Sequence, residues 1–374
     1  MRIGICFGGY CPLHRGHMDV IMRAKKENDL TYVFVCGYDD EPRATQYDIP
    51  LMKRYRIIAN FLSSENVRVR PLNLSDETVR VRYINDTTLN IDESMSDSNW
   101  GIWTNYAYDI VAREVPYAPN QDYTWYMAEE SYVAPIKKWS PYPHVKCVLM
   151  DRSEHPISGT AIRNNPLKYW DEITIPFRPY FSHNILITGT ASEGKTTLTE
   201  DIGKYFGLPY SYEKGRDNCL LKTDKEFTVK DFMYNIYEQH KYNEELICSP
   251  WNPGVFISDT DNCVTLMYAF AYSQRKDFAL NEDEYDILYD MAAAYMKTTK
   301  WDKVFLIKPR PQGIVDDGYR YMGDSSYNIR LQFYEHLKSL YQQFNIPFEE
   351  IDGSYYDNFL KVRDYINNLY KEEK

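Results

Sequence analysis

The chain has 374 residues, which exceeds the size at which one hydrophobic core usually stops growing, so we expect two domains. Its formal net charge of -11 argues against binding a nucleic-acid backbone, because such binding normally shows as a basic face. Seven scattered cysteines without a CxxC pair disfavour a secreted disulfide framework. No signal peptide or membrane span is visible, so we expect a cytoplasmic protein that does not bind membranes.

The first half of the chain alternates between apolar strands and helical spacing. We expect strands at Arg2–Gly8, Thr31–Gly37, Val67–Arg70, Tyr123–Ala128 and His144–Asp151, and helices at Gly16–Asn28 and Leu51–Ser63. This alternation predicts a parallel α/β sheet with crossover helices. The polar stretch Ser75–Asn99 has little periodicity, and we expect a long loop or insertion there, a candidate mobile cover.

A second domain is predicted to start after the segment Ile175–His183, which contains two prolines. Strands are expected at Asn184–Gly189, Pro209–Glu213, Val255–Asp261, Lys303–Lys308 and Phe348–Ile351, with helices that include Lys195–Phe206 and Asn328–Phe344. The expected fold class is α/β, with two doubly wound parallel-sheet domains over residues 1–180 and 181–374.

The segment GGYCPLHRGH, which starts at Gly8, allows two interpretations. Cys11, His14 and His17 are good transition-metal ligands, but a zinc site needs three or four ligands and the domain offers no obvious further cluster. The alternative is a phosphate site, because the segment links a strand end with Gly8 and Gly9 to a helix start. Imidazole N–H groups there can hold triphosphate oxygens. This setting favours the phosphate site, with Cys11 as a bystander.

A second anion site is predicted in ISGTAIR, residues 157–163. The first turn of a helix there would offer the hydroxyl groups of Ser158 and Thr160 together with backbone N–H groups, and Arg163 could pair with phosphate one turn later. The simpler alternative is a serine helix cap followed by a solvated arginine.

The second domain contains GTASEGKT, which fits the phosphate-loop pattern G-x-x-x-x-G-K-[ST] between a buried strand and a helix. Glycines let backbone N–H groups wrap phosphate, Lys195 reaches the β- and γ-phosphates, and the Thr196 hydroxyl ligates Mg²⁺. The domain is therefore predicted to bind a nucleoside triphosphate. The candidate ATP-binding residues of this loop are Gly189, Ser192, Glu193, Gly194, Thr196 and Thr197.

A kinase also needs a metal-orienting carboxylate and a group that activates the acceptor hydroxyl. Asp259 and Asp261 lie at the end of a predicted strand, where a Walker-B-like carboxylate should sit, although Asp261 could equally belong to a solvated turn. Glu213 could accept the acceptor's proton, and Arg216 lies beside it. Either could instead be a capping or surface residue.

A lid is predicted over Val315–Arg330, because the segment is polar and flanked by glycines. Arg320 or Arg330 could close on the charge of the transferring phosphoryl group. Since arginines are common on surfaces, each could also be a plain solvated residue.

Both halves resemble known enzymes. GGYCPLHRGH resembles the GxFxPxHxGH signature of the nucleotidylyltransferase superfamily, and ISGTAIR resembles its later ISxTxIR signature. Nearly end to end, the chain resembles the bifunctional NadR type, in which a nicotinamide-mononucleotide (NMN) adenylyltransferase is fused to a ribosylnicotinamide kinase. Further stretches that carry this resemblance are CGYDDEPR, KRYRIIANF, NWGIWTN, AEE, YEKGRD, SDTD and DDGYRYMG.

The resemblance implies roles in adenylyl transfer for residues of the first domain. His14 and His17 would bind ATP phosphates, Ser158 and Arg163 would complete that cradle, and Trp103 would stack on nicotinamide. Trp103 could equally be a core aromatic in so aromatic a chain.

For the second domain the resemblance implies a kinase site. Lys195 and Thr196 would serve ATP and Mg²⁺, while Glu213 and Asp259 would be the base and the metal-side carboxylate. Substrate-binding roles would fall to residues around the riboside, with two tyrosines on either side of its cationic ring. These residues are Tyr212, Arg216, Tyr242 and Asp261.

The implied function is NAD salvage, in which nicotinamide riboside is phosphorylated to NMN and NMN is adenylylated to NAD. ATP, nicotinamide riboside, NMN and NAD are the expected ligands, Mg²⁺ the expected cofactor, and a homo-oligomer is left open. Other acceptors, such as pantetheine phosphate or deoxynucleosides, are alternatives within the same folds. A nucleotide-sensing regulator without turnover is the alternative outside enzymes.

The chain departs from the family pattern in a few places. Gly9 stands where relatives often carry lysine, so part of the phosphate charge compensation is expected from elsewhere. Tyr212 and Ile314 each stand where a tryptophan is usual. Since the first predicted strand begins at Arg2, we expect no DNA-binding helix-turn-helix ahead of it and no repressor role.

Overall fold

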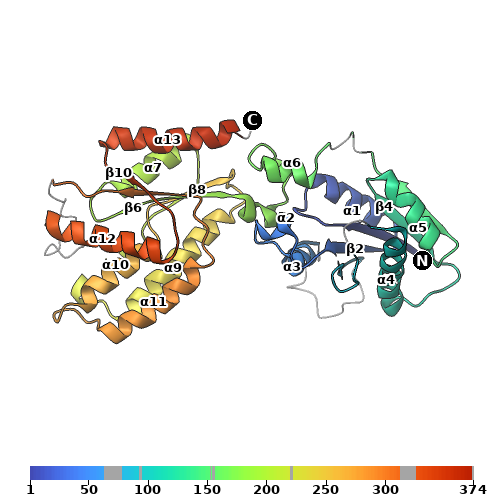
Figure 1. Cartoon of the computed structure of the whole chain (residues 1–374), viewed down its shortest axis with the longest axis horizontal. Coiled ribbons are helices and arrows are strands. Elements are labelled where there is room, and N and C mark those ends of the chain that lie inside the picture. The colour runs from blue at the N-terminus through green and yellow to red at the C-terminus, as the bar shows by residue number, and fades with distance from the viewer. Residues whose placement is uncertain are drawn as a thin grey trace. The chain divides into compact units, whose positions relative to one another are not determined.

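The computed structural model describes residues 1–62, 78–91, 95–151, 153, 156–219, 222–311 and 326–372. The chain forms two compact units, Met1–Phe181 and Ser182–Lys374. Each unit is a five-stranded parallel sheet with helices on both faces (Figure 1). The expected fold class, two doubly wound α/β domains, is confirmed. None of the described helices is long and apolar enough to cross a membrane.

The sheet of the N-terminal unit has the strand order β3-β2-β1-β4-β5. Its strands are β1 (Arg2–Gly8), β2 (Leu30–Gly37), β3 (Val79–Asn85), β4 (Asp122–Met127) and β5 (Val145–Leu149). After Arg2, the central strand β1 has no polar or charged side chain from Ile3 to Phe7, as expected where helices cover both sides of a strand. All carboxyl ends of these parallel strands meet at one edge, where loops can gather functional residues.

Two layers of helices cover this sheet. Helices α1 (Arg15–Glu27) and α3 (Leu51–Leu62) pack against side chains of one face, including Cys6 and Val33. Helices α4 (Asp97–Glu114) and α5 (Val133–Trp139) pack against the other face. The remaining short elements are α2 (Pro42–Thr45), η3 (Glu130–Tyr132), α6 (Gly159–Asn164), η4 (Trp170–Glu172) and η5 (Ile175–Phe181).

The sheet of the C-terminal unit has the strand order β10-β9-β6-β8-β7. Its strands are β6 (His183–Gly189), β7 (Tyr210–Ser211), β8 (Val255–Ser258), β9 (Lys303–Ile307) and β10 (Glu349–Ile351). Strand β6 therefore lies at the centre, and the loop that follows it opens at the carboxyl edge of the sheet.

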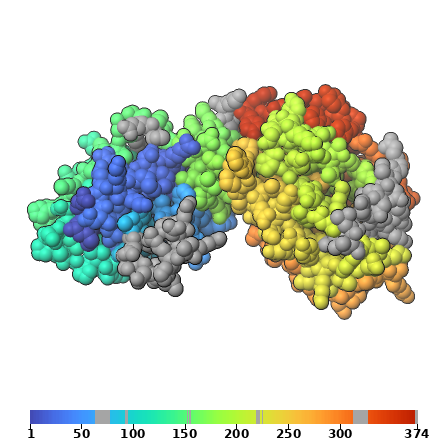
Figure 2. Space-filling model, turned by 180° about the vertical axis from the view of Figure 1, so that it is seen from behind, coloured from blue at the N-terminus to red at the C-terminus, as the bar shows by residue number. Residues whose placement is uncertain are grey.

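Helices α7 (Lys195–Phe206) and α13 (Tyr355–Glu372) cover one face of this second sheet and contact each other; Figure 2 shows α13 in red. The other face carries the larger apolar core, built with α9 (Val229–Ile247), α10 (Asn262–Ser273), α11 (Glu282–Met296) and α12 (Tyr327–Gln343). Two short helices, α8 (Gly215–Cys219) and η6 (Asp224–Glu226), follow β7.

One sequence prediction about the fold is wrong. Residues 75–99 are not one long loop, because β3 pairs with β2 there and α4 begins at Asp97. The strand was not predicted because two arginines make its sequence look polar: Arg80 and Arg82 alternate with the buried Val79 and Val81. In the structure, both arginines form ion pairs with Glu114, at 3.0 and 2.5 Å. The strand expected at 67–70 lies outside the described residues.

Candidate functional site

The histidine segment connects the carboxyl end of β1 to the first turn of α1. The imidazole rings of His14 and His17 stack with their centroids 3.6 Å apart and their planes at 27°. The backbone N–H of His17 donates to the carbonyl of His14 over 2.9 Å, which places the two rings one turn apart at the helix start. His14 is buried, with 4% of its surface exposed. The two rings thus form one compact pair of polar groups beside a helix N-terminus.

Helix α6 brings the second predicted anion site to this segment. Arg163 donates from Nη1 to the carbonyl of Cys11 over 2.5 Å and from Nη2 to the Thr160 hydroxyl over 3.0 Å. A Cβ at Gly159 would lie 2.8 Å from the same carbonyl oxygen, so only glycine permits this approach. The Ser158 hydroxyl accepts from the backbone of Ala161 and caps the helix. Two motifs about 150 positions apart in the sequence therefore build one site.

Cys11 points away from the two histidines. Its thiol donates to the carbonyl of Arg43 over 3.2 Å, and burial raises the pKa of the thiol. Across the described residues, no group of three or more His, Cys, Asp or Glu side chains could hold a metal ion. The Cys11 thiol is therefore hydrogen-bonded to the backbone, while the assignment of the two histidines to phosphate binding stays a prediction.

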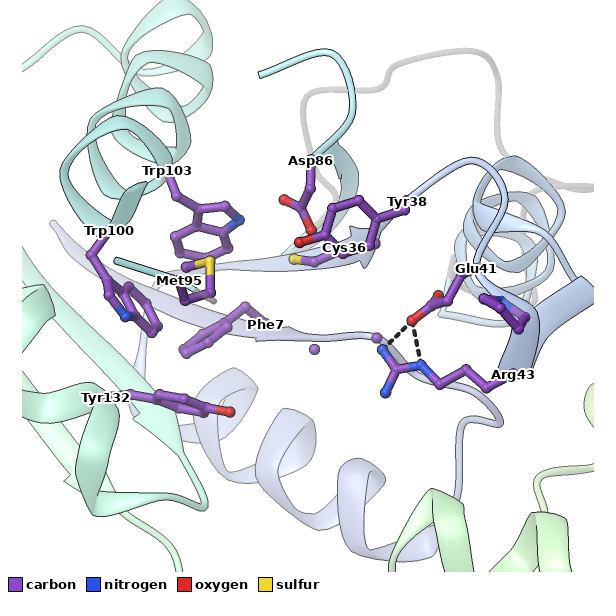
Figure 3. Close-up of a pocket in the computed structure, with 14 residues that line it drawn as sticks. Phe7, Cys36, Tyr38, Glu41, Arg43, Asp86, Met95, Trp100, Trp103 and Tyr132 are labelled. Carbon is purple, nitrogen blue, oxygen red and sulfur yellow. Dashed lines mark hydrogen bonds and ion pairs between the residues drawn. The ribbon is translucent and has the colours of Figure 1, made fainter. Parts of the chain in front are cut away.

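Beside Gly8 and Gly9 lies a cavity of about 600 Å³. One end is aromatic, and Trp103 packs there with its ring centroid 5.1 Å from that of Phe7 (Figure 3). Trp100 and Tyr132 complete this end. The predicted position of Trp103 in a ring-binding pocket stays a prediction, but its side chain does line a cavity that also reaches the glycine loop.

The other end of the cavity is charged. The Glu41 carboxylate accepts from Arg43 through one oxygen and from Arg54 through the other, the latter over 2.7 Å (Figure 3 shows the Arg43 pair). Arg54 is fully buried, whereas about half of the Arg43 side chain is exposed. Asp86, just after β3, also lines the cavity, and burial together with the charge of Glu41 raises its pKa to about 7.

The phosphate loop of the C-terminal unit joins β6 to α7. Gly189 and Gly194 have φ angles of 148° and 82°, which favour glycine. A Cβ at Gly189 would also lie 2.7 Å from the carbonyl oxygen of Ile307 on the neighbouring strand. Lys195 is buried and donates to the carbonyl of Thr190 over 2.7 Å, so its ammonium folds back over the loop. Thr197 continues the first turn of α7.

Around Thr196, the structure brings together most of the predicted kinase residues. The Thr196 hydroxyl donates to Asp259 Oδ2 over 2.7 Å and accepts from Arg216 Nη2 over 3.1 Å. Arg216 in turn pairs with Glu213 at 3.4 Å. Burial raises the pKa of Asp259 to about 6, and no described group donates to its Oδ1 atom. A hydroxyl and a carboxylate with a spare buried oxygen make a donor set that suits Mg²⁺.

Asp261 and Arg330 have structural partners that the sequence did not suggest. Asp261 caps α10 by accepting from the backbone of Cys263 over 3.0 Å, and it also accepts from the Tyr341 hydroxyl. Arg330 is 2% exposed and forms an ion pair with Glu193 of the phosphate loop. Both residues hold the loop surroundings in place, so the expectation of a solvated turn at Asp261 is wrong. Arg320 and Ile314 lie outside the described residues.

Tyr212 and Tyr242 lie close together, with ring centroids 5.4 Å apart and planes at 62°. The ammonium of Lys214 lies 4.7 Å from the centre of the Tyr212 ring and 4.5 Å from that of Tyr242. Lys214 also donates to the Tyr212 hydroxyl over 3.0 Å. This pair of aromatic faces therefore already holds one cation.

Sequence reasoning missed several residues that line the sites. Glu41, Arg43 and Lys214 were visible only as parts of stretches that carry the resemblance, and Asp86 lay in the expected loop. Only Asp86 had a signal in the sequence: it directly follows a run in which apolar and charged residues alternate, and strand ends at this edge supply functional groups.

Comparisons with known proteins agree with both halves. Residues 5–165 match the cytidylyltransferase-like family, and residues 184–357 match a family described as AAA domain. Over 391 aligned residues the chain is 26% identical to the trifunctional NAD biosynthesis/regulator protein NadR of Escherichia coli, covering 100% of this chain and 84% of that protein. The chain is thus similar to NadR over its full length. The Salmonella typhimurium NadR matches at the same identity and coverage.

Solved NadR structures show the same two-unit fold. A crystal structure of NadR protein in complex with NR has a TM-score of 0.81 and 26% identity, covering 97% of this chain and 96% of that one. A second, in complex with NAD and AMP-PNP, has a TM-score of 0.80 and 25% identity, with the same coverage. The first half thus matches a cytidylyltransferase-like family and the second an AAA family, and the whole chain is similar to NadR in sequence and fold.

Proposed function

We propose that this chain makes NAD in two steps at two separate sites. The C-terminal unit would phosphorylate nicotinamide riboside with ATP, and the N-terminal unit would adenylylate the resulting NMN with a second ATP, releasing pyrophosphate. The observation that carries this proposal is that each unit has its own phosphate loop, assembled with partners from distant parts of the same unit. The NadR structures with NR and with NAD and AMP-PNP support these ligands.

In the N-terminal unit, a phosphate oxygen of NMN would attack the α-phosphorus of ATP, and pyrophosphate would leave. His14 and His17 stabilise the charge on the phosphate oxygens as hydrogen-bond donors, and Arg163 adds a fixed positive charge beside them. No covalent intermediate is needed, because positioning and electrostatics suffice for such a displacement. The aromatic end of the cavity, with Trp103, receives the nicotinamide ring.

In the C-terminal unit, Lys195 would bind the β- and γ-phosphates of ATP once these displace it from the carbonyl of Thr190. Glu213 accepts the proton of the riboside 5′ hydroxyl, and its ion pair with Arg216 orients the carboxylate. Thr196 and Asp259 would hold Mg²⁺, which neutralises phosphate charge when bound.

The aromatic pair of the kinase unit supports a cationic substrate. A pyridinium ring carries its positive charge over a flat surface, and Tyr212 and Tyr242 already hold the Lys214 ammonium at cation–π distance. Riboside binding would replace this ammonium with the ring. A neutral deoxynucleoside gains no such attraction.

The direct test is a product assay with purified protein, nicotinamide riboside, ATP and Mg²⁺, in which NMN and NAD are quantified separately by chromatography. We expect NMN to appear first and NAD to follow with an equal amount of pyrophosphate. Parallel reactions with deoxynucleosides and with pantetheine phosphate provide the matched controls. Turnover of those compounds and not of the nicotinamide ones would contradict the proposal, and so would ATP binding without any product.

A further inference from the structure

The side chain of Lys214 is fixed against the aromatic pair of the C-terminal unit. Its ammonium lies 4.7 Å from the centre of the Tyr212 ring and 4.5 Å from that of Tyr242. The same ammonium donates to the Tyr212 hydroxyl over 3.0 Å and to the Asp217 carboxylate over 3.2 Å. Of the whole side chain, 21% is exposed. Two rings, a hydroxyl and a carboxylate therefore hold one positive charge at this place.

The backbone of Lys214 is anchored to α9, the helix that carries Tyr242. Its N–H donates over 2.8 Å to the side-chain oxygen of Gln239, a residue of α9 that is 2% exposed. The Gln239 amide in turn donates to Asn243 on the same helix. The hydrogen bond to the Tyr212 hydroxyl is the main cause that raises the pKa of the Lys214 ammonium, so this group stays charged at neutral pH.

The two tyrosine rings lie too close together to admit a third ring between them. Their centroids are 5.4 Å apart and their planes stand at 62°, an edge-to-face contact. A flat ring stacked between two aromatic faces needs about 7 Å between the two centroids, because carbon atoms in contact lie about 3.5 Å apart. The rings of Tyr212 and Tyr242 must therefore separate, and the Lys214 ammonium must leave, before a pyridinium ring can lie between them.

We propose that Lys214 is a tethered competitor of the riboside: its ammonium occupies the cation site of Tyr212 and Tyr242 and thereby lowers the affinity of the C-terminal unit for its substrate. This inference rests on the proposed riboside phosphorylation and adds a residue that sets the KM of that reaction. Because the competitor belongs to the chain, the fraction of molecules with an open pocket is constant. The apparent dissociation constant of every ligand of this pocket is then raised by the same factor, whatever the charge of the ligand.

The test uses Lys214→Met in the full chain, because methionine keeps a long side chain and removes the charge. We expect the KM for nicotinamide riboside to fall by roughly 3- to 10-fold, the gain expected when a cation–π competitor is lost. The dissociation constant of the riboside, measured by titration calorimetry, should fall by the same factor. Lys241→Met is the matched control and should change neither value, because Lys241 also lies over a tyrosine ring, that of Tyr237, but on an exposed part of α9.

The reduced form of the riboside separates competition from charge repulsion, because its ring has nearly the same shape and no charge. Competition predicts that Lys214→Met tightens the binding of both forms by the same factor, with both dissociation constants measured by calorimetry. A gain confined to the cationic form would overturn the inference, since it would mean that the ammonium repels the ring without occupying its place. A large loss of kcat with an unchanged KM, the result expected of a catalytic lysine, would overturn it too.

A second variant, Lys214→Ala, removes the side chain as well as the charge and should lower the KM for the riboside in the same range. Melting temperatures, together with a KM for ATP within about twofold of wild type, check that each variant is folded around an intact phosphate loop. Riboside phosphorylation with an unchanged or raised KM in both variants overturns the inference and leaves the proposed function standing. A wild-type protein that makes no NMN, while both variants bind the riboside more tightly, overturns the proposed function and leaves this inference standing.

Discussion

The two glycine-containing loops that follow the central strands of this chain differ in where their charges come from. The loop at Gly189–Thr196 carries its own lysine, and a threonine in the same motif contacts Asp259. The loop at Gly8–His17 has no lysine. Its own arginine, Arg15, is exposed at the start of α1, and two further arginines, Arg43 and Arg163, reach the loop from other elements. Both loops follow the central strand of a parallel sheet and lead into a helix.

This difference shows that one kind of loop can be charged either locally or through the tertiary structure. A local lysine depends only on the fold of its own turn, so the motif predicts its chemistry. Charges brought from other elements depend on how those elements pack, as the close approach of Gly159 to Cys11 illustrates. Single substitutions should therefore affect the two sites in different ways.

The largest effect is expected from Lys195→Ala. Loss of the ammonium that binds the β- and γ-phosphates should lower riboside phosphorylation by on the order of a thousandfold, with NMN adenylylation unchanged. Rates of NMN and NAD formation from separate substrates measure the two activities. Lys204→Ala, on an exposed part of α7, is the control. Loss of both activities in a folded Lys195→Ala protein would contradict the two-site assignment.

His17→Ala tests the other loop. Removing one imidazole donor should lower adenylyl transfer by on the order of a hundredfold and leave riboside phosphorylation intact, because Arg43 and Arg163 still compensate part of the charge. The readout is NAD formation from NMN and ATP. His144→Ala replaces an exposed histidine just before β5 and should change neither rate. A rate of NAD formation in His17→Ala as high as that in His144→Ala would refute the role of His17.

The substitution Asp86→Asn tests one of two buried carboxylates that follow strands, Asp86 in the N-terminal unit and Asp259 in the C-terminal unit. Asp259 accepts from a hydroxyl through Oδ2, and no described group donates to Oδ1 of either carboxylate. Because burial raises the folded-state pKa of Asp86 to about 7, the folded protein binds a proton that the unfolded chain releases at lower pH. Stability is then lost as pH rises from about 4 to 7.

The variant should remove this pH dependence. We expect Asp86→Asn to unfold with a free energy about 1 to 3 kcal/mol higher than wild type at pH 8, and equal to it at pH 4. Hydrogen exchange in β2 and β3 at both pH values localises the effect to the N-terminal unit. An equal gain at both pH values would show that the carboxylate does not titrate in this window.

The smallest effect is expected for Cys11→Ser. A serine hydroxyl can donate to the carbonyl of Arg43 as the thiol does, so adenylyl transfer should stay within about twofold of wild type. His14→Ala, three positions on, should lower it strongly. Steady-state NAD formation measures both. A large loss of NAD formation in Cys11→Ser would show that Cys11 takes part in the chemistry of the site.

The sequence by itself determined the parts that follow from local patterns. Uninterrupted apolar runs marked the central strands, and glycine, lysine and threonine at fixed spacing marked the phosphate loop, because each of these signals lies within one strand or one turn. It also placed Asp259 and Glu213 after strands, where the sheet edge gathers them. The alternation in β3 was not recognised because Glu114, the ion-pair partner of its two arginines, lies on another element.

Only the tertiary structure decided which charges reach which loop. Nothing in the sequence places Arg43 against Gly9, pairs Arg330 with Glu193 or sets the Lys214 ammonium between two tyrosine rings. Those contacts depend on the path of the chain between strands and on side chains filling space that a glycine leaves. A sequence pattern records residue types and spacing, whereas charge compensation is a property of distance, which the packed fold alone supplies.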